Sequence, residues 1–341
     1  MSTNPILEVR DLEVVFATAG GPVEAVRGVD LTLASGGVLG IVGESGSGKS
    51  VTMRAVLGLL PPTARIRGSV RFHSEELLGS SNRRLRQLRG QRIGMIFQDP
   101  MTALNPVITI GEQIVEAIRI HDRRIGHDQA MARAVELLEL VAIPFPERRV
   151  RQYPHEFSGG MRQRAVIAMA MANRPELLIA DEPTTALDVT IQAQILDVLA
   201  RLRVERGVSL ALITHDLSVV AGVADHVAVM YAGRVAERGP VNEVFYRPRH
   251  PYTRGLLAAT PRVEGDVVRL RTIDGAPPSL ARRPTGCAFH PRCQLADVRC
   301  ASEEPKLREI DGGHAACHHA VAMAEMPMAA GEREGRNGCA V

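Results

Sequence analysis

The chain has 341 residues, a formal net charge of +3 at pH 7, 45% apolar residues and 23% charged residues. This length predicts one large α/β domain with a smaller appendage, and the composition excludes a globally disordered chain. The small net charge gives no electrostatic case for nucleic acid or an anionic membrane surface as a partner.

The polar start and the apolar runs of the chain bear on its compartment. No run approaches the roughly 18 apolar residues that cross a bilayer, and the first residues lack a charged and then apolar signal segment. We therefore expect a cytosolic protein, in which disulfides are disfavoured.

The first sixty residues predict an antiparallel sheet and then a strand, a loop and a helix. Apolar and polar residues partly alternate over residues 6–17, with similar patterning at 26–29 and 31–33. The apolar run 38–42 leads into a glycine-rich turn. Residues 50–60 then predict a helix that ends at two prolines.

The glycine-rich turn reads Gly-Glu-Ser-Gly-Ser-Gly-Lys-Ser over residues 43–50 and matches the phosphate-loop motif G-x-x-x-x-G-K-[ST] in its required strand-to-helix context. Its glycines let backbone N–H groups surround phosphate oxygens, and the following helix adds a positive dipole. Lys49 would neutralise phosphate charge and Ser50 would ligate Mg²⁺. The alternative is a glycine-rich turn without a ligand. The expected ATP-binding residues here are Gly43, Ser45, Gly46, Gly48, Lys49, Ser50 and Val51.

The middle of the chain predicts a helical insertion and then alternating strands and helices. Helical patterns surround residues 114–118 and 134–138. From residue 161 the expected elements are a helix to 173, a strand over 177–180, a helix over 189–206, a strand over 209–214, a helix over 217–224 and a strand over 227–231. This alternation predicts a parallel sheet.

The strand over 177–180 is followed by Asp181 and Glu182. Ligands of such sheets bind at the carboxyl ends of the strands, so we expect Asp181 to hold Mg²⁺ and Glu182 to act as general base for the attacking water. Taken alone, two solvated acids at a strand end would be the simpler interpretation. The phosphate loop favours the functional one.

Phe157-Ser158-Gly159-Gly160-Met161 precedes this strand and resembles the signature sequence of ATP-binding cassette (ABC) ATPases, usually L-S-G-G-Q. Further segments resemble the Q-loop, D-loop and switch histidine in the family's order, namely Gln98, Ala186-Leu187-Asp188 and His215. The resemblance implies an α/β ABC-type nucleotide-binding domain, with a phosphate-loop parallel-sheet core, an antiparallel β subdomain and a helical subdomain.

The resemblance also implies roles for single residues. Two cassettes would pack head to tail, with each ATP between the phosphate loop of one and Ser158, Gly159 and Gly160 of the other. Gln98 would contact Mg²⁺ and the catalytic water, Asp188 would link the two sites, and His215 would contact the γ-phosphate. Phe16 would stack on adenine where the family often has Tyr, although a core position is equally open. Met161 replaces the usual Gln and leaves a polar contact there in question.

Residues 247–257, residues 99–106 and the F-S-G-G-M variant resemble ABC importers for dipeptides, oligopeptides and nickel. By itself, 247–257 would be a proline-broken linker and a short helix. The resemblance implies an importer ATPase at the cytoplasmic face of the inner membrane, with two permease subunits, a second identical or related ATPase and, indirectly, a solute-binding protein. Alternatives are an importer for nickel or another solute, a soluble non-transport ABC ATPase, and a metal-bearing scaffold with an inactive cassette.

All five cysteines follow residue 286. The four cysteines Cys287, Cys293, Cys300 and Cys317 contain no C-x-x-C pair, a poor match to zinc ribbons. Residues 286–293 resemble the C-terminal extension of peptide-importer ATPases, some of which carry a [4Fe-4S] cluster. We expect the four cysteines to hold a [4Fe-4S] cluster. Bound Zn²⁺ is the alternative, and free structural thiols are a third interpretation. Cys339 is expected to be uninvolved. Spare ligands for zinc are His290, His314, His318 and His319.

A composition shift after Pro261 predicts a domain boundary. The expected ABC domain covers residues 1–261, with its helical subdomain at about 100–173. A C-terminal extension with the four cysteines covers 262–321, and residues 322–341 are expected to form a flexible tail.

Overall fold

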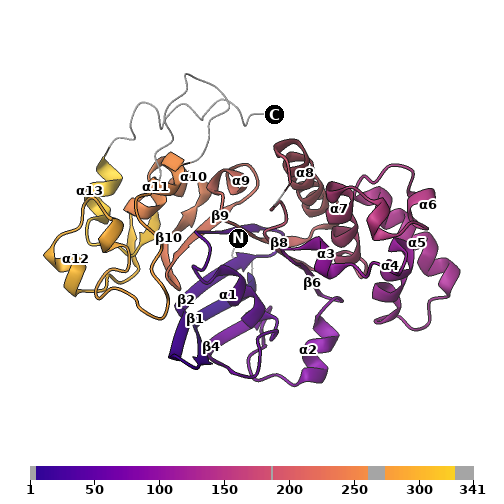
Figure 1. Ribbon diagram of the computed structural model, residues 1–341, viewed down its shortest axis with the longest axis horizontal. Helices are drawn as coiled ribbons and strands as arrows, with labels where there is room; N and C mark the ends of the chain where they lie inside the picture. The colour runs from indigo at the N-terminus through magenta and orange to yellow at the C-terminus, as the bar shows by residue number, and fades with distance from the viewer. Residues whose placement is uncertain (1–4, 186, 260–272, 327–341) are drawn as a thin grey trace. The chain divides into compact units, whose positions relative to one another are not determined.

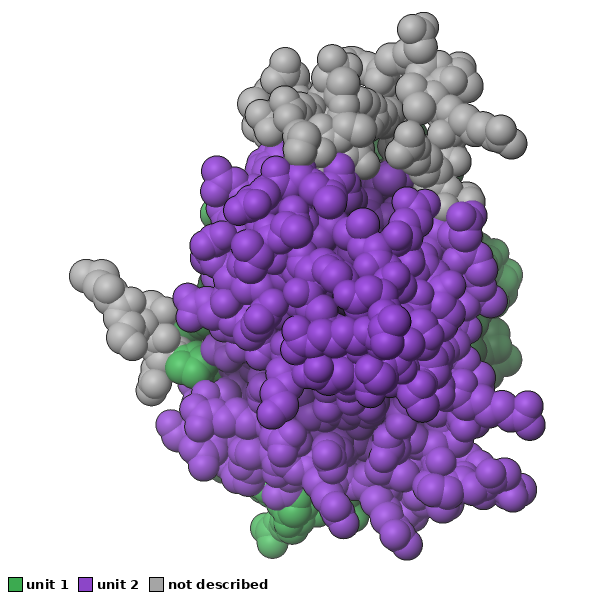
Figure 2. Space-filling view, turned by 90° about the vertical axis from the view of Figure 1, so that its left-hand side faces the viewer, with its two compact units in different colours: residues 1–6, 34–37, 79–213 green, residues 7–33, 38–78, 214–341 purple. Residues whose placement is uncertain are grey.

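The computed structural model describes residues 5–185, 187–259 and 273–326 (Figure 1). They form two compact units, coloured separately in Figure 2. Unit 1 comprises residues 1–6, 34–37 and 79–213, and unit 2 comprises residues 7–33, 38–78 and 214–341. The expected boundary at residue 261 lies outside the described residues.

Unit 1 contains three parallel strands in the order β6 (Ile93–Ile96), β7 (Leu177–Asp181) and β8 (Ser209–Thr214). Every residue of β7 and β8 is buried, which explains their unbroken apolar pattern. The helices of this unit are α2 (Asn82–Leu88), α3 (Pro100–Ala103), α4 (Ile110–Arg119), α5 (His127–Leu140), α6 (Pro146–Arg149), α7 (Gly159–Ala170) and α8 (Val189–Arg206), with the 3₁₀ helix η1 (Pro154–Glu156). Helices α4, α5 and α7 pack against one another (Figure 1).

Unit 2 contains two groups of strands. The antiparallel sheet has the order β2 (Gly21–Ala34), β1 (Pro5–Thr18), β4 (Ala64–Phe72) and β5 (Glu75–Glu76). The second group has the order β11 (Arg308–Ile310), β12 (Gly313–Ala315), β10 (Arg234–Pro240), β9 (His226–Tyr231) and β3 (Val38–Val42). Only the β3–β9 pair of this group is parallel among the described residues. The C-terminal region thus extends the sheet that carries the phosphate loop.

The helices of unit 2 are short. They are α1 (Lys49–Val56), α9 (Leu217–Ala221), α10 (Val241–Tyr246), α11 (Pro251–Ala259), α12 (Val298–Ser302) and α13 (Ala320–Glu325), with the 3₁₀ helix η2 (His290–Arg292). Among the described residues, no helix combines the length and the apolar character needed to cross a membrane.

The helix predicted over residues 50–60 ends earlier than expected, at Val56. Gly58 adopts φ 61°, and the N–H groups of Gly58 and Leu59 donate to the carbonyls of Ala55 and Arg54 at 3.0 and 2.8 Å. This left-handed glycine termination stops the helix before the prolines are reached.

Two further helices are also shorter than predicted. Helix α7 ends at Ala170 instead of residue 173, with Met171 as its C-cap, and Arg174 adopts φ 53°, outside the helical region. Helix α9 ends at Ala221 instead of residue 224, and Gly222 is its C-cap.

The first residues of the expected tail are helical, because α13 includes residues 322–325. Ala320 and Met323 of this helix are buried, and Ala320 joins a small core with Ile310, Ala315 and Cys317. Burial against the β11–β12 hairpin therefore orders this helix despite its weak sequence pattern. Residues 327–341 lie outside the described residues.

Candidate functional site

The glycines of the phosphate loop are required by close backbone approaches as well as by backbone angles. Gly43 adopts φ 155° and Gly48 adopts φ 101°. A Cβ atom at Gly43 would lie 2.2 Å from the Met230 carbonyl oxygen, and one at Gly48 would lie 2.6 Å from the Ala25 carbonyl oxygen. Since no side chain fits at these distances, β2 and β9 of unit 2 shape the loop.

Lys49 lies inside this loop with an exposed fraction of only 4%. Its Nζ donates to the carbonyl oxygens of Gly43 and Glu44 at 2.6 and 2.9 Å. Helix α1 begins at the same residue and has no acidic side chain in its first turn, so its positive end is not neutralised. Ser45 and Gly46 are exposed, and Ser50 and Val51 are half-buried. The loop is therefore preformed for an anion such as a phosphate chain.

The two carboxylates after the predicted acidic strand have different environments. Asp181 is the last residue of β7 and is fully buried. Glu182 is half-buried and adopts φ 49°, an uncommon angle for a non-glycine residue that costs of order 1 kcal/mol. The backbone N–H of Glu182 donates to the Ile213 carbonyl at 2.9 Å, and this hydrogen bond stabilises the strained backbone conformation.

The Glu182 side chain has two described partners within unit 1. Its Oε2 atom accepts a hydrogen bond from Gln98 Nε2 at 3.1 Å and from Thr185 Oγ1 at 2.8 Å. The structure thus brings together Gln98 and Glu182, which the sequence places 84 residues apart. Sequence reasoning missed Thr185, whose only signal is its position three residues after Glu182.

The predicted signature residues lie at the start of α7. Ser158 is its N-cap, and its Oγ accepts the Met161 N–H at 3.3 Å. Gly160 is buried, and a Cβ atom there would lie 2.6 Å from Ile191 Cγ2. Asp188 caps α8 in the same way, with Oδ1 accepting the Ile191 N–H at 2.9 Å. Ser158 and Gly159 are exposed, so this helix terminus remains accessible. Ala186 lies outside the described residues.

The two remaining predicted ATP contacts lie in unit 2. Phe16 is half-buried near the end of β1, where it pairs with Ala64, and it is not a core residue. His215 is exposed and directly follows β8. Asp216, the next residue, caps α9 by accepting the Ser218 N–H at 2.8 Å.

The segment 247–257 is a buried anchor and not a simple linker. Arg249, His250, Tyr252 and Thr253 have exposed fractions of 3% or less. The backbone N–H groups of Arg249 and His250 donate to the buried Glu237 carboxylate at 2.7 and 3.0 Å. Tyr252 Oη accepts the N–H of Glu44, a phosphate-loop residue, at 2.8 Å. The short helix α11 was predicted, but these tertiary contacts were not.

Comparison with known proteins assigns both parts of the chain. Residues 26–185 match the family model described as ABC transporter, and residues 236–300 match the one described as oligopeptide/dipeptide transporter, C-terminal region. The chain is 54% identical over 312 residues to the oligopeptide transport ATP-binding protein OppD of Bacillus subtilis, with 91% of this chain and 87% of that protein covered. This chain belongs to the ABC transporter ATP-binding proteins.

Further relatives and a solved structure support the assignment to this family. The OppD proteins of Salmonella typhimurium and Mycobacterium bovis are 51% and 55% identical, each over 92% of this chain. The chain covers 93% of the Salmonella protein and about half, 52%, of the Mycobacterium protein. A solved dimeric ATP-binding cassette bound to ADP and Pi is 27% identical, with a TM-score of 0.62, over 69% of this chain and 98% of that one. The predicted fold class is therefore confirmed.

The four predicted cysteine ligands of this ABC protein are all described and free of disulfides. Cys300 and Cys317 are buried, and Cys287 and Cys293 are half-buried. Burial raises the pKa of Cys287 to about 11 and that of Cys317 to about 12, and the three other thiols also raise the pKa of Cys317. The Cys287 N–H donates to the Cys300 carbonyl at 2.8 Å, and His319 contacts the Sγ atoms of both Cys300 and Cys317, so these three cysteines lie close together. Cys339 lies outside the described residues.

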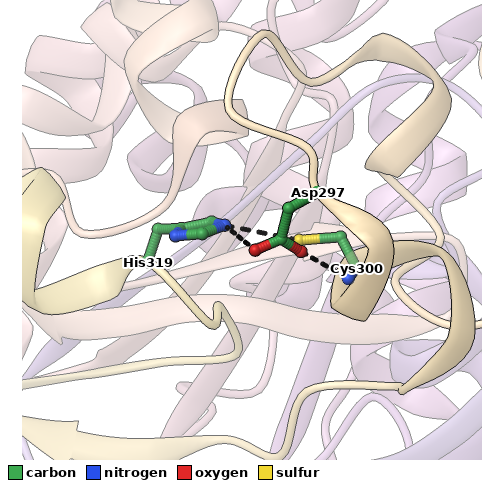
Figure 3. Close-up of side chains that lie close together, drawn as sticks. All are labelled: Asp297, Cys300 and His319. Carbon is green, nitrogen blue, oxygen red and sulfur yellow. Dashed lines mark hydrogen bonds and ion pairs between the residues drawn. The ribbon is translucent and has the colours of Figure 1, made fainter.

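Among the predicted spare histidines, His319 places its imidazole beside a described thiol. Its Nε2 lies 3.6 Å from Cys300 Sγ and 3.3 Å from Asp297 Oδ2, an arrangement shown in Figure 3. These three side chains form a candidate metal-binding group. His290 Nδ1 and His318 Nε2 each lie 3.0 Å from a backbone carbonyl oxygen instead, and His314 lies in β12.

Proposed function

We propose that this chain is the ATP-binding and ATP-hydrolysing subunit of an importer, and that it energises uptake of dipeptides, oligopeptides or related solutes. The observation that supports this best is a preformed phosphate loop in the same unit as a C-terminal region that matches the oligopeptide/dipeptide transporter model. The names of the relatives from Bacillus and Salmonella support the peptide as cargo.

The proposed roles follow from the chemistry of each group. Lys49 neutralises the phosphate chain, while Ser50, Gln98 and Asp181 serve Mg²⁺. Glu182 takes the proton of the attacking water, and His215 contacts the γ-phosphate. Phe16 stacks on the adenine. Ser158, Gly159, Gly160 and Asp188 serve the ATP bound by a second cassette. The exposure of Ser158, Gly159 and Asp188 at the starts of α7 and α8 supports this role.

The proposed assembly has further subunits. Two membrane-spanning permease subunits would form the pathway, and a second ABC ATPase, identical or related, would complete the nucleotide sites. A solute-binding protein would deliver the cargo from outside. The chain would then lie at the cytoplasmic face of the inner membrane as a peripheral protein.

An uptake measurement in proteoliposomes tests this assignment. The chain is co-purified with its permease subunits and companion ATPase, and oligopeptide and Ni²⁺ uptake are measured separately with their binding proteins. We expect ATP-dependent uptake of a peptide. Nickel uptake without peptide uptake would overturn the proposed cargo, and ATP hydrolysis by a chain that associates with no membrane subunit would overturn the importer.

We also propose that Cys287, Cys293, Cys300 and Cys317 hold a [4Fe-4S] cluster. The donor set fits, because the four cysteines are free of disulfides and three of them, Cys287, Cys300 and Cys317, lie close together. The backbone N–H of His319 lies 3.3 Å from Cys317 Sγ, a contact of the kind that tunes cluster thiolates. When bound, the cluster would crosslink segments that otherwise have a small core. Zinc is the alternative, either on the same four cysteines or on the group Cys300, His319 and Asp297.

Metal analysis of anaerobically purified variants separates these two sites. We expect about four irons per wild-type chain, their loss in Cys293→Ser, and retention in His319→Ala, because only the first removes a cluster ligand. Cys339→Ser is the matched control and retains the iron. One zinc or no metal in the wild type would contradict the cluster. Loss of a zinc in His319→Ala with retention in Cys293→Ser would assign it to Cys300, His319 and Asp297, and the reverse pattern would assign it to the four cysteines.

A further inference from the structure

The acidic residue of the phosphate loop is held by the C-terminal region. The guanidinium of Arg292 makes a two-pronged ion pair with Glu44, with Nη1–Oε2 and Nη2–Oε1 distances of 2.7 and 2.9 Å. The Arg292 side chain is only 6% exposed and that of Glu44 is 24% exposed. A bidentate pair with so little access to water fixes the position of the carboxylate as well as its charge.

Arg292 is itself anchored on other sides. Its Nε donates to the Asp274 carbonyl at 2.9 Å, and Nη1 lies 3.3 Å from Tyr231 Oη. The guanidinium carbon also lies 5.9 Å from the ring centres of both Tyr231 and Phe289. With these contacts, the guanidinium has little freedom to follow Glu44 if the loop moves.

A second contact reaches the same loop residue from α11. The Glu44 N–H donates to Tyr252 Oη, so both the backbone and the side chain of Glu44 are fixed from the C-terminal side. The rings of Tyr231, Tyr252 and Phe289 pack together with centroid distances of 4.6 to 5.4 Å. Phe289 and Arg292 both lie between Cys287 and Cys293, so the cysteine-bearing loop carries this support.

We propose that Arg292 is a positioning residue for nucleotide binding, which holds Glu44 and thereby fixes the phosphate loop in its anion-binding conformation. This inference rests on the proposed ATP binding and extends it to the C-terminal region. Arg292 acts through Glu44 and does not contact the nucleotide. Because the proton transfer is assigned to Glu182 and not to the phosphate loop, removal of Arg292 changes the affinity for ATP more than the chemical step.

The test measures Mg-ATP binding by equilibrium titration of the full chain. We expect Arg292→Ala to raise the dissociation constant about tenfold, with the KM for ATP rising alike and kcat at saturating ATP within about twofold of wild type. Arg283→Ala is the matched control, because Arg283 pairs with Glu24, outside the phosphate loop. Wild-type affinity in Arg292→Ala, or a loss equal to that in Arg283→Ala, would overturn the inference.

Glu44→Gln separates positioning from a simple charge effect and keeps the test decisive if Arg292→Ala does not fold. Removal of a negative charge beside a phosphate site would strengthen ATP binding if Glu44 acted through its field alone. We expect Glu44→Gln to bind ATP more weakly instead. We also expect the double variant Arg292→Ala/Glu44→Ala to bind ATP no more weakly than Glu44→Ala, because the two residues act as one pair. Stronger binding, or additive losses, would contradict the inference. These variant results bear on the role of Arg292 alone. The proposed function itself fails only if the wild-type chain binds no ATP.

Discussion

Glu182→Gln is expected to lower the rate of ATP hydrolysis about 10²- to 10³-fold while Mg-ATP binding is retained, because the amide cannot accept the proton of the attacking water. The amide keeps the shape of the side chain, and its oxygen can still accept from Gln98 and Thr185. The strained backbone at φ 49° is also unchanged. The loss should therefore appear in kcat, measured by phosphate release at saturating ATP with the proposed permease subunits and second ATPase present.

The control for this variant lies at the other end of the same strand. Glu176 precedes β7 and pairs with Arg92 in a half-exposed ion pair, which contributes at most about 1 kcal/mol to stability. Glu176→Gln should hydrolyse ATP at the wild-type rate. Turnover by Glu182→Gln close to that of Glu176→Gln would show that another group is the base.

Arg249→Ala is expected to destabilise the protein by about 3 kcal/mol, because it removes one partner of a buried ionic network. The Arg249 side chain has an exposed fraction of 0%. Its Nη2 lies 2.7 Å from Glu243 Oε2, and the same atom donates to the Asp311 carbonyl. It thereby ties α10 to the β11–β12 hairpin. Urea unfolding of the chain measures the effect, with Arg247→Ala, an exposed neighbour, expected within about 0.5 kcal/mol of wild type.

The loss of stability caused by Arg249→Ala should become larger as the pH rises. Burial raises the pKa of Glu237 to about 7, and the nearby Arg249 charge limits that rise. A carboxyl whose folded-state pKa is raised contributes stability at low pH that is lost as the pH rises through that pKa. Without Arg249 the pKa rises further, so the stability deficit should be larger at pH 8 than at pH 6. Burial lowers the pKa of His250 to about 4, so this neighbour stays neutral at both pH values. An equal deficit at both would contradict this account.

The sequence alone predicted most of the fold and supplied the candidate site residues. The predicted bounds of α8 and β8 are those of the structure. The start of α8 is defined locally by its N-cap Asp188, and β8 is defined by a short run of buried residues. The phosphate loop and the signature were found because their residues are consecutive. Three helix ends were wrong, those of α1, α7 and α9. Helix α1 ends through the left-handed Gly58, a local backbone geometry that the hydrophobic pattern does not report.

Contacts between distant segments were decided only by the tertiary structure. The sequence determined that a phosphate loop, an acidic strand and a cysteine-bearing extension are present, since each is a local pattern of residue types. It did not reveal that Arg292 pairs with Glu44, 248 residues earlier in the chain. Nor did it reveal that the Glu237 carboxylate accepts a hydrogen bond from Arg249, in a segment whose sequence alone predicts a linker. Such pairs depend on which surfaces the folded chain buries together, because a buried charge is tolerated only where a partner compensates it.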